Sequence, residues 1–468
     1  MLGANCEEDH PLLKKYTEHL TKEMDEIEGK CWKTERGYEV SFKLKLVPAD
    51  QKWVASMSGE LNNAATYFSS FANVNQDNKG TMGGSIGEHS NATWKPWNYD
   101  DRMKTVKKVE KFKKKLKDPV KKERNKVTAF ISKERSRQEY APALGKYVDC
   151  VKAEPLHNTN NAWQHLFTFM LAIAMQYTDP NVLKAVTAFT ELTSSVPIVK
   201  FMYCIRNVVK CGRLFKSFTR WFREKRKNKI SFSYRFTGLE SKKFSWNFAF
   251  AIQELLNFDS IKQSTKLKLH ALAFAALQLR EAVAIYSRVE VDRELVQKLF
   301  LKCNNYFNTN GLFHGNAVCP TTWTVGYAIP YHCNQLFESI GYGLGLSTMQ
   351  GREAKHIKLA KYVQNTCNVR KSDRWWVVFR HEFVSIVWMR ELEPMSTTYR
   401  SKRKPGKSYV PNRIIKNPGR YCFCGNTMEP ESNNKCVVCS SDIMSMIQQS
   451  VTDCKVHSSL KEMFDEAM

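Results

Sequence analysis

The chain has 468 residues, of which 43% are hydrophobic, and this composition excludes a mainly disordered protein and allows two or three domains. Its formal net charge of +26 favours a polyanionic partner, most commonly nucleic acid, although a generally soluble basic surface would give the same total. No stretch has the pattern of a signal peptide or the length of a membrane span, and fourteen cysteines without dense regular spacing are typical of the cytosol or nucleus, so we expect no membrane association.

The N-terminal part predicts one helix followed by the clearest strand pattern of the sequence. Asp9 is placed to cap a helix in which apolar residues recur at helical spacing as far as Ile27. Residues 40–46 then alternate between apolar and polar side chains, which is the pattern of a half-buried strand, and Asp50 follows its end. Residues 66–74 are a second candidate strand, and 80–91 are rich in Gly and Ser and predict a loop.

The next segment is strongly basic. Residues 102–137 contain 16 Lys or Arg against four acidic residues, together with a thin apolar stripe that includes Val106 and Val109. This pattern predicts a basic amphipathic helix, broken near Pro119. We expect its lysines to neutralise DNA phosphates, with the following as the candidates: Lys107, Lys108, Lys111, Lys114 and Lys115.

The middle of the chain predicts mainly helices, which we place at residues 163–177, 181–189, 267–286, 291–307, 347–365 and 372–391. Residues 212–229 interleave aromatic side chains with eight basic ones, so Trp221 and Phe222 are available for packing or stacking. The alternative is that Phe215, Phe218 and Phe222, which have helical spacing, simply belong to the core. The candidate DNA-binding residues of this segment are Arg220, Arg223, Lys225, Arg226 and Lys227.

Paired cysteines near the C-terminus predict a zinc site. Cys422 and Cys424 precede an eleven-residue loop that leads to Cys436 and Cys439. Short pairs let a turn present two thiolates to one tetrahedral ion, and four ligands leave no open position, so the expected Zn²⁺ is structural. Free thiols and disulfides are the alternatives, and Cys454 or His457 could replace one ligand. The preceding basic stretch 400–420 is a predicted linker, in which residues 401–407 resemble a nuclear import signal.

Two acidic residues are candidates for phosphoryl-transfer chemistry. Glu353 shares a helical face with His356, and Asp50 ends the predicted strand at a place where α/β folds often carry functional groups. Two-metal catalysis needs carboxylates that converge from separate elements. Caps and surface side chains are the alternative interpretation of both residues.

Two short stretches resemble the catalytic core of the RNase H-like DDE transposases, in particular the Transib transposases and the RAG-type V(D)J recombinase. Residues 2–10 (LGANCEEDH) are similar to the strand end that carries the second catalytic Asp of that family. Residues 331–345, followed by Gly351-Arg352-Glu353, are similar to the approach to the helix that bears its final Glu.

The resemblance implies metal-dependent cleavage and transfer of DNA strands, with Mg²⁺ or Mn²⁺ as cofactor. Glu353 matches the last metal ligand, Asn5 occupies the position of the second Asp, and the counterpart of the first Asp would precede Met1. An amide at position 5 lacks the charge that holds Mg²⁺ and activates water, so we expect the activity to be weakened or lost. The chain resembles a truncated or domesticated element.

We therefore expect an α/β fold: an incomplete RNase H-like core with a large helical insertion and a small C-terminal zinc-ribbon-like module. The expected parts are 1–150 (core with basic helix), 151–320 (helical insertion), 321–398 (helices with the final Glu), 399–420 (basic linker) and 421–468 (zinc module). The expected function is that of a nuclear, transposase-derived DNA-binding protein, for which a homodimer is one arrangement. The alternatives are a non-catalytic chromatin or DNA-binding adaptor with structural zinc, and a zinc-ribbon interaction protein unrelated to transposition.

Overall fold

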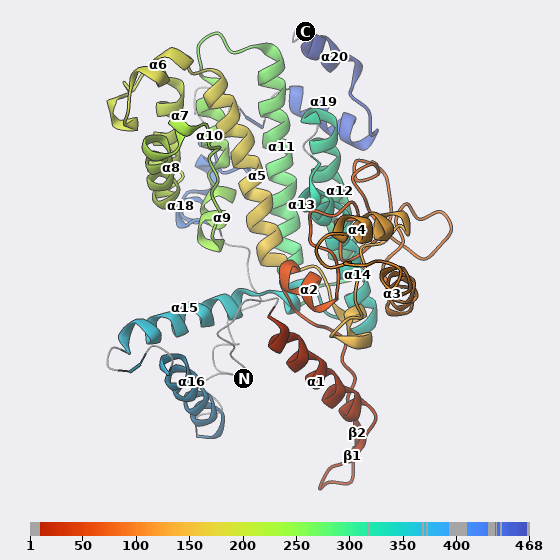
Figure 1. The fold of residues 1–468 in the computed structure, drawn as a ribbon. Helices are drawn as coiled ribbons and strands as arrows, with labels where there is room; N and C mark the ends of the chain where they lie inside the picture. The colour runs from red at the N-terminus through yellow and green to blue at the C-terminus, as the bar shows by residue number, and fades with distance from the viewer. Residues whose placement is uncertain are drawn as a thin grey trace. The chain divides into compact units, whose positions relative to one another are not determined.

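The computed structural model describes residues 10–315, 318–366, 369–370, 373–392, 410–428, 436, 438–439 and 442–465. These residues are mostly helical (Figure 1). They belong to two compact units, each built from segments that are distant in sequence. The first unit draws on 1–78, 85–155 and 344–407, and the second on 79–84, 156–343 and 408–468. The C-terminal cysteine segment therefore shares a unit with the central helices.

The first unit contains a small sheet and α-helices that range from 7 to 18 residues in length. Its elements are α1 (Pro11–Glu28), β1 (Cys31–Lys33), β2 (Glu39–Ser41), α2 (Gln51–Met57), α3 (Tyr99–Lys113), α4 (Arg124–Lys133), the 3₁₀ turns η1 (Gly145–Cys150) and η6 (Leu344–Ser347), α15 (Gln350–Asn365) and α16 (Arg374–Glu391). His10 caps α1, because its Nδ1 accepts a hydrogen bond from the backbone N–H of Leu12 at 3.2 Å. The predicted cap, Asp9, lies outside the described residues.

The strand predicted over residues 40–46 is shorter than expected. β1 and β2 pair antiparallel with Trp32 opposite Val40, and this pairing ends at Ser41. Beyond it, the N–H of Leu44 donates to the carboxylate of Glu28 at 2.7 Å, so a side chain takes the place of a neighbouring strand. Residues 66–74 form only isolated bridges. Among the described residues this two-stranded ribbon is the only sheet, and the expected RNase H-like α/β core is not seen.

The basic segment forms two helices, α3 and α4, with a break between Lys113 and Arg124 as predicted around Pro119. Asn98 caps α3 by accepting from the N–H of Asp101 at 2.8 Å. Val109 is fully buried in an apolar cluster with side chains of α4 and of the segment after α2. The predicted amphipathic pattern is confirmed: one face of α3 packs on the protein and leaves its lysines on the other.

A buried ion network fixes α3 and the chain after α4 to the end of α2. The carboxylate of Glu60 is fully buried and is paired with the guanidinium groups of Arg102 and Arg137, which are 4% and 0% exposed. Ser70 donates a further hydrogen bond to Glu60 at 2.6 Å. Burial alone would raise the pKa of Glu60, but Arg137 and Arg102 more than compensate and lower it.

The second unit is a helical assembly around α11. Its elements are α5 (Pro155–Gln176), α6 (Pro180–Ala185), η2 (Phe189–Glu191), α7 (Pro197–Asn207), α8 (Gly212–Glu224), η3 (Arg226–Asn228), α9 (Gly238–Ser245), α10 (Phe248–Leu256), α11 (Gln263–Tyr286), α12 (Arg293–Phe313), α13 (Pro320–Trp323), the π-helical turn η5 (Thr324–Ala328), α14 (Ile329–Ile340), α18 (Asn412–Lys416), η8 (Pro418–Arg420), α19 (Asp442–Thr452) and α20 (Ser458–Asp465).

Helix α11 forms the centre of this unit and is buried along most of its length. It packs chiefly against α12, and also contacts α10, α19 and α20. The small Ala side chains of this helix allow its neighbours to approach closely. A helix that is buried on most sides, as α11 is, belongs in the core of a unit. Within the described part of the chain, no helix is both long and apolar enough to cross a membrane.

Candidate zinc centre and basic surfaces

The first cysteine pair lies on a tight turn between Tyr421 and Thr427, which form an antiparallel bridge. Within it, the N–H of Gly425 donates to the carbonyl of Cys422 at 2.8 Å, and the N–H of Cys422 donates to the carbonyl of Asn426 at 2.8 Å. Gly425 has a φ of +96°, a conformation that side chains with a Cβ rarely adopt. The turn therefore depends on glycine and presents both cysteines on the same side.

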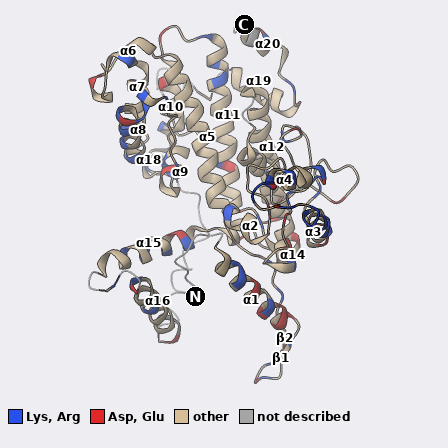
Figure 2. Cartoon of the chain, viewed as in Figure 1, with Lys and Arg blue, Asp and Glu red and all other residues tan. Residues whose placement is uncertain are grey.

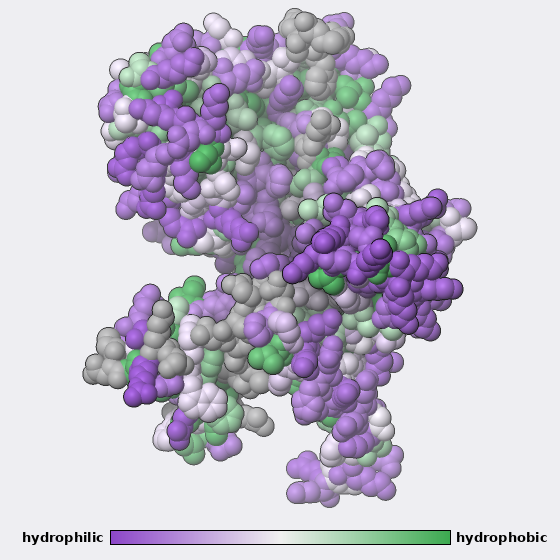
Figure 3. Space-filling model, viewed as in Figure 1, coloured by the Kyte–Doolittle hydropathy of each residue, from purple (hydrophilic) through white to green (hydrophobic). Residues whose placement is uncertain are grey.

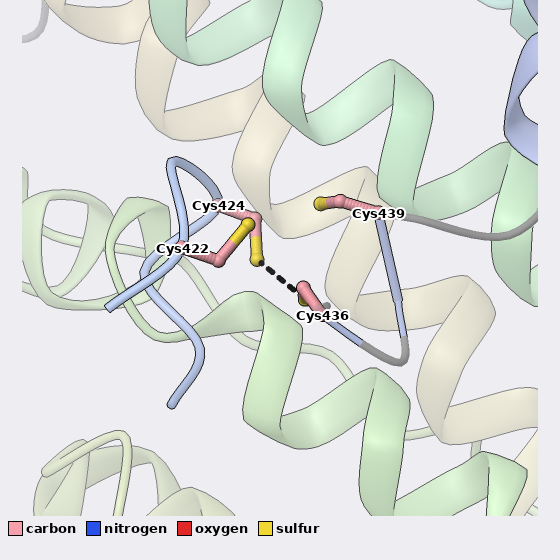
Figure 4. A group of neighbouring side chains, drawn as sticks. All are labelled: Cys422, Cys424, Cys436 and Cys439. Carbon is pink, nitrogen blue, oxygen red and sulfur yellow. Dashed lines mark hydrogen bonds between the residues drawn. The ribbon is translucent and has the colours of Figure 1, made fainter. Parts of the chain in front are cut away.

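The second pair completes a cluster of four thiols (Figure 4). The sulfur atoms of Cys422, Cys424, Cys436 and Cys439 all lie within 4.8 Å of one another. All four cysteines are free, and the Cys424 and Cys436 sulfurs are 3.5 Å apart, too far for a disulfide. Tetrahedral zinc with Zn–S bonds of about 2.3 Å would separate its sulfurs by about 3.8 Å. The thiols thus have the spacing and chemistry of a Cys₄ zinc site, as the sequence predicted.

The two alternative ligands lie outside this cluster. Cys454 is hydrogen-bonded to Asn308 at 3.3 Å instead. His457 accepts through Nδ1 from the N–H of Ser459 at 3.3 Å. Only the four paired cysteines meet as a candidate metal site among the described residues.

Groups around the cluster support the thiols and anchor them to the helical unit. Asn426 is buried, and its backbone N–H donates to the Cys424 sulfur at 3.5 Å. Arg280 of α11 donates to the carbonyl oxygens of Cys424, at 3.2 Å, and Phe423. The Arg280 guanidinium also lies 4.2 Å from the ring centre of Trp246. The cysteine segment is therefore joined to α11 and is not an appendage of the linker.

The charge of Arg280 suits a cluster of thiolates. Burial lowers the pKa of Arg280, and the neighbouring cysteines oppose that effect. Within the cluster the thiols act on one another: the contact between Cys422 and Cys424 lowers the pKa of Cys422 and raises the pKa of Cys424. Arg280 is not among the residues expected from the sequence, because its partners Cys424 and Phe423 lie more than 140 positions away in the chain.

The predicted basic surface on α3 is exposed. Figures 2 and 3 show Lys and Arg along α3 and α4, and a hydrophilic surface over them. Four of the five predicted lysines are exposed and form no ion pair within the described residues: Lys107, Lys111, Lys114 and Lys115. Lys108 pairs with Glu134 at 2.6 Å. We call the four lysines the α3 basic face.

A second basic surface lies on α8 and η3, in the other unit. Arg220, Arg223, Lys225 and Lys227 are exposed, although Arg223 pairs with Glu224 at 2.7 Å. The guanidinium of Arg226 lies 4.1 Å from the ring centre of Phe222 and is half-buried.

The aromatic side chains of α8 belong to the core. Phe215, Phe218 and Phe222 are all buried, so the alternative interpretation of their helical spacing is the right one. The indole N–H of Trp221 donates to the carbonyl of Ile230 at 2.7 Å. The surface of α8 thus offers charge rather than a row of aromatic rings.

The described candidate catalytic residues, Asp50 and Glu353, lie at the starts of two different helices. Asp50 caps α2, with its carboxylate accepting from the N–H groups of Lys52 and Trp53 at 2.7 and 3.0 Å. Glu353 lies in the first turn of α15, 3.9 Å from His356, with its side chain 43% exposed. Asn5 and the predicted import signal at 401–407 lie outside the described residues. The contacts of Asp50 are those of a helix cap.

Comparison with known proteins adds no assignment. No protein-family model matches the sequence, and no curated protein matches it.

Proposed function

We propose that this chain is a nuclear DNA-binding protein in which the α3 basic face contacts the phosphate backbone and a Cys₄ zinc site stabilises the second unit. The observation that carries the DNA-binding part is the α3 basic face itself. Lys107 and Lys111 project from α3, and Lys114 and Lys115 lie in the turn that directly follows it. The opposite face of α3 is fixed by the buried Glu60 network, so the four charges are held close together at the end of one supported helix.

The distribution of charge favours a polyanion over a merely soluble surface. An ordinary solvated helix balances its lysines with carboxylates at i+3 or i+4. The acidic residues of α3 are Asp100 and Asp101 in its first turn and Glu110, and Asp101 pairs with Lys104 at 2.8 Å. Lys111, Lys114 and Lys115 follow Glu110 without a further acidic residue before Asp118. Unbalanced lysines of this kind release counterions when they bind phosphates.

The zinc part rests on the four free thiols and on their support by Asn426 and Arg280. Bound zinc would be held by Cys422, Cys424, Cys436 and Cys439 and would join two segments of chain that are eleven residues apart. With four protein ligands there is no position for water or substrate, so the role of zinc is structural.

A transposase ancestry is a further part of the proposal, supported by the sequence resemblance. Glu353 stays our candidate for the surviving metal ligand. Since position 5 carries an amide, we propose that strand cleavage in Mg²⁺ is weak or absent and that DNA binding is the retained activity. Incubation of the purified chain with DNA and Mg²⁺ tests this: cleavage that disappears on Glu353→Ala would contradict it.

Binding to a fluorescent DNA duplex tests the central part of the proposal. Changing Lys107, Lys111, Lys114 and Lys115 together to Gln should weaken binding by more than tenfold at low salt, because phosphate contacts supply most of the non-specific affinity. The matched control changes four exposed lysines on other helices to Gln: Lys15, Lys22, Lys298 and Lys361. Equal losses in both variants would mean that net charge alone is responsible, and would refute the α3 basic face.

A further inference from the structure

A cysteine outside the zinc cluster has an unusual set of neighbours. Cys319 lies between α12 and α13, directly before Pro320, and caps the first turn of α13. Its sulfur accepts a hydrogen bond from the N–H of Thr322 at 3.4 Å and lies 3.3 Å from the hydroxyl oxygen of the same residue. A hydroxyl and an amide that both point at one sulfur stabilise its ionised form.

A histidine completes this arrangement from another helix. His165 of α5 places its Nε2 3.3 Å from the Cys319 sulfur, and the two residues belong to the same compact unit. They are 154 positions apart in sequence, so only the fold brings them together. A thiol within hydrogen-bonding distance of an imidazole is the arrangement that activates a cysteine as a nucleophile.

The charges in this pair favour the thiolate near neutral pH. Burial alone would raise the pKa of Cys319, but the hydrogen bond and charge of His165, with the hydrogen bonds of Thr322, lower it to about 7. In turn, the hydrogen bond to Cys319 raises the pKa of His165. From α12, Tyr306 faces the same sulfur, and burial raises the pKa of its phenol, so it stays neutral. Thiolate and imidazolium therefore stabilise each other.

Other cysteines of the second unit provide a contrast. Burial raises the pKa of Cys204 and Cys211 to about 12, and Cys303 is fully buried with its pKa raised as well. These three thiols are buried, while Cys319 is partly exposed. Among these four thiols, which all lie outside the zinc cluster, reactivity should therefore concentrate at Cys319.

We propose that Cys319 is a nucleophilic thiolate that is modified by low-molecular-weight disulfides, with His165 as its positioning partner. In the reaction, the Cys319 sulfur attacks one sulfur of the small disulfide and forms a mixed disulfide. The original S–S bond breaks, and the second sulfur leaves as a thiolate that takes a proton from the His165 imidazolium or from water. No net oxidant is needed beyond the disulfide itself.

The pH dependence of alkylation tests the proposal on the full-length chain. Iodoacetamide labelling at each cysteine, followed by mass spectrometry, should give Cys319 a midpoint near pH 7 and a rate well above that of Cys211. Oxidised glutathione, used as the small disulfide, should then form its adduct at Cys319 in preference to Cys204 and Cys303. Exposed Cys31 reports how far simple accessibility explains labelling.

Substitution of His165 tests whether this residue, rather than solvent accessibility, makes Cys319 reactive. His165→Gln should move the Cys319 midpoint towards that of an ordinary thiol, about 8.5, while the rate at Cys31 stays unchanged. Circular dichroism verifies that the variant is folded. A wild-type midpoint of about 8.5 or higher would refute the proposal whether or not the variant folds, and so would a folded His165→Gln variant with the wild-type midpoint.

Discussion

At the scale of single residues, the least expected feature is the burial of charge in the first unit. Glu60, Arg102 and Arg137 are all removed from water, and each depends on the others for compensation. Such clusters add little net stability relative to apolar side chains, but removal of one partner leaves a buried charge unpaired. The cluster therefore serves chiefly to hold α3 in one orientation.

Neutralising Glu60 should unfold the first unit more readily. We expect Glu60→Gln to lower the free energy of unfolding by about 3–5 kcal/mol, because two buried guanidinium groups lose their counter-charge. Urea denaturation followed by circular dichroism measures the change. Glu110→Gln, at an exposed position on α3, should stay within about 0.5 kcal/mol of wild type. Similar small losses in both variants would show that the buried network is not important.

The same carboxylate should make stability depend on acid pH. Its pKa in the folded chain is below the unfolded value of about 4.3, so ionised Glu60 stabilises the fold above that value. This contribution is lost as the pH falls through the folded pKa. Denaturation between pH 3 and pH 6 should show a smaller loss of stability with acid in Glu60→Gln than in wild type; parallel curves would contradict this assignment.

Gly425 is the residue on which the cysteine turn depends. A Cβ at this position would lie 2.5 Å from the carbonyl oxygen of Trp246, and φ is +96°. Gly425→Ala should therefore distort the turn, at a cost of at least about 1–2 kcal/mol from backbone strain alone, and weaken zinc binding. Competition with a chromophoric chelator measures the affinity. Gly419→Ala, where an added Cβ meets no atom within 4 Å, is the matched control and should bind zinc as wild type does.

At the scale of elements, the sequence predicted helices well and sheet structure poorly. The long helices α5, α11, α12, α15 and α16 all overlap the ranges expected from apolar periodicity, because a helix closes its hydrogen bonds within one segment. Their ends are less well predicted: α5 begins at Pro155 rather than at 163, and α12 extends to Phe313 rather than to 307. A strand needs a partner from elsewhere in the chain, which alternation in one segment does not reveal. Residues 40–46 alternate in sequence, yet pairing stops at Ser41 and the side chain of Phe42 is exposed, so the predicted half-buried strand is not formed.

The candidate sites also could be predicted only where their residues are close together in the sequence. The cysteine cluster could be predicted because its ligands are close in sequence and their chemistry is specific. Arg280 and the pair formed by His165 and Cys319 could not, since their partners come from segments more than 140 residues away. Asp50 is a candidate because it follows the predicted strand, whereas in the structure it is the cap of the short helix α2.

Arg280 joins α11 to the cysteine turn through its hydrogen bonds, and we expect these bonds to support zinc binding. Arg280→Met keeps most of the side-chain volume but removes the hydrogen bonds to Cys424 and Phe423. We expect zinc affinity to fall about 10- to 100-fold, as is typical when groups that support metal ligands are lost. Isothermal titration with Zn²⁺ provides the measurement. Arg288→Met, on a residue whose Nε donates to the carbonyl of Ala284 at 3.2 Å near the end of α11, should leave the affinity unchanged.

At the scale of the whole molecule, each unit carries a basic surface, and the second unit also carries the cluster of four cysteines that could hold a metal ion such as zinc. The net charge of +26 is concentrated on α3, α4, α8 and the segment 400–420. Charge of this kind gives affinity for phosphate backbones without sequence preference. The catalytic part of the sequence resemblance depends on Asn5 and Glu353, whereas DNA binding by the α3 basic face requires neither of them.

The salt dependence of DNA binding measures how many phosphate contacts the α3 basic face makes. The affinity of the chain for a DNA duplex, measured by fluorescence anisotropy across a salt series, should fall steeply, with a slope of about 0.9 per phosphate contact in the logarithmic plot. Changing Lys107, Lys111, Lys114 and Lys115 to Gln should reduce that slope by about 3 to 4, and the control variant at Lys15, Lys22, Lys298 and Lys361 should keep it. An unchanged slope in the α3 variant, or no binding by the wild-type chain at low salt, would contradict the account.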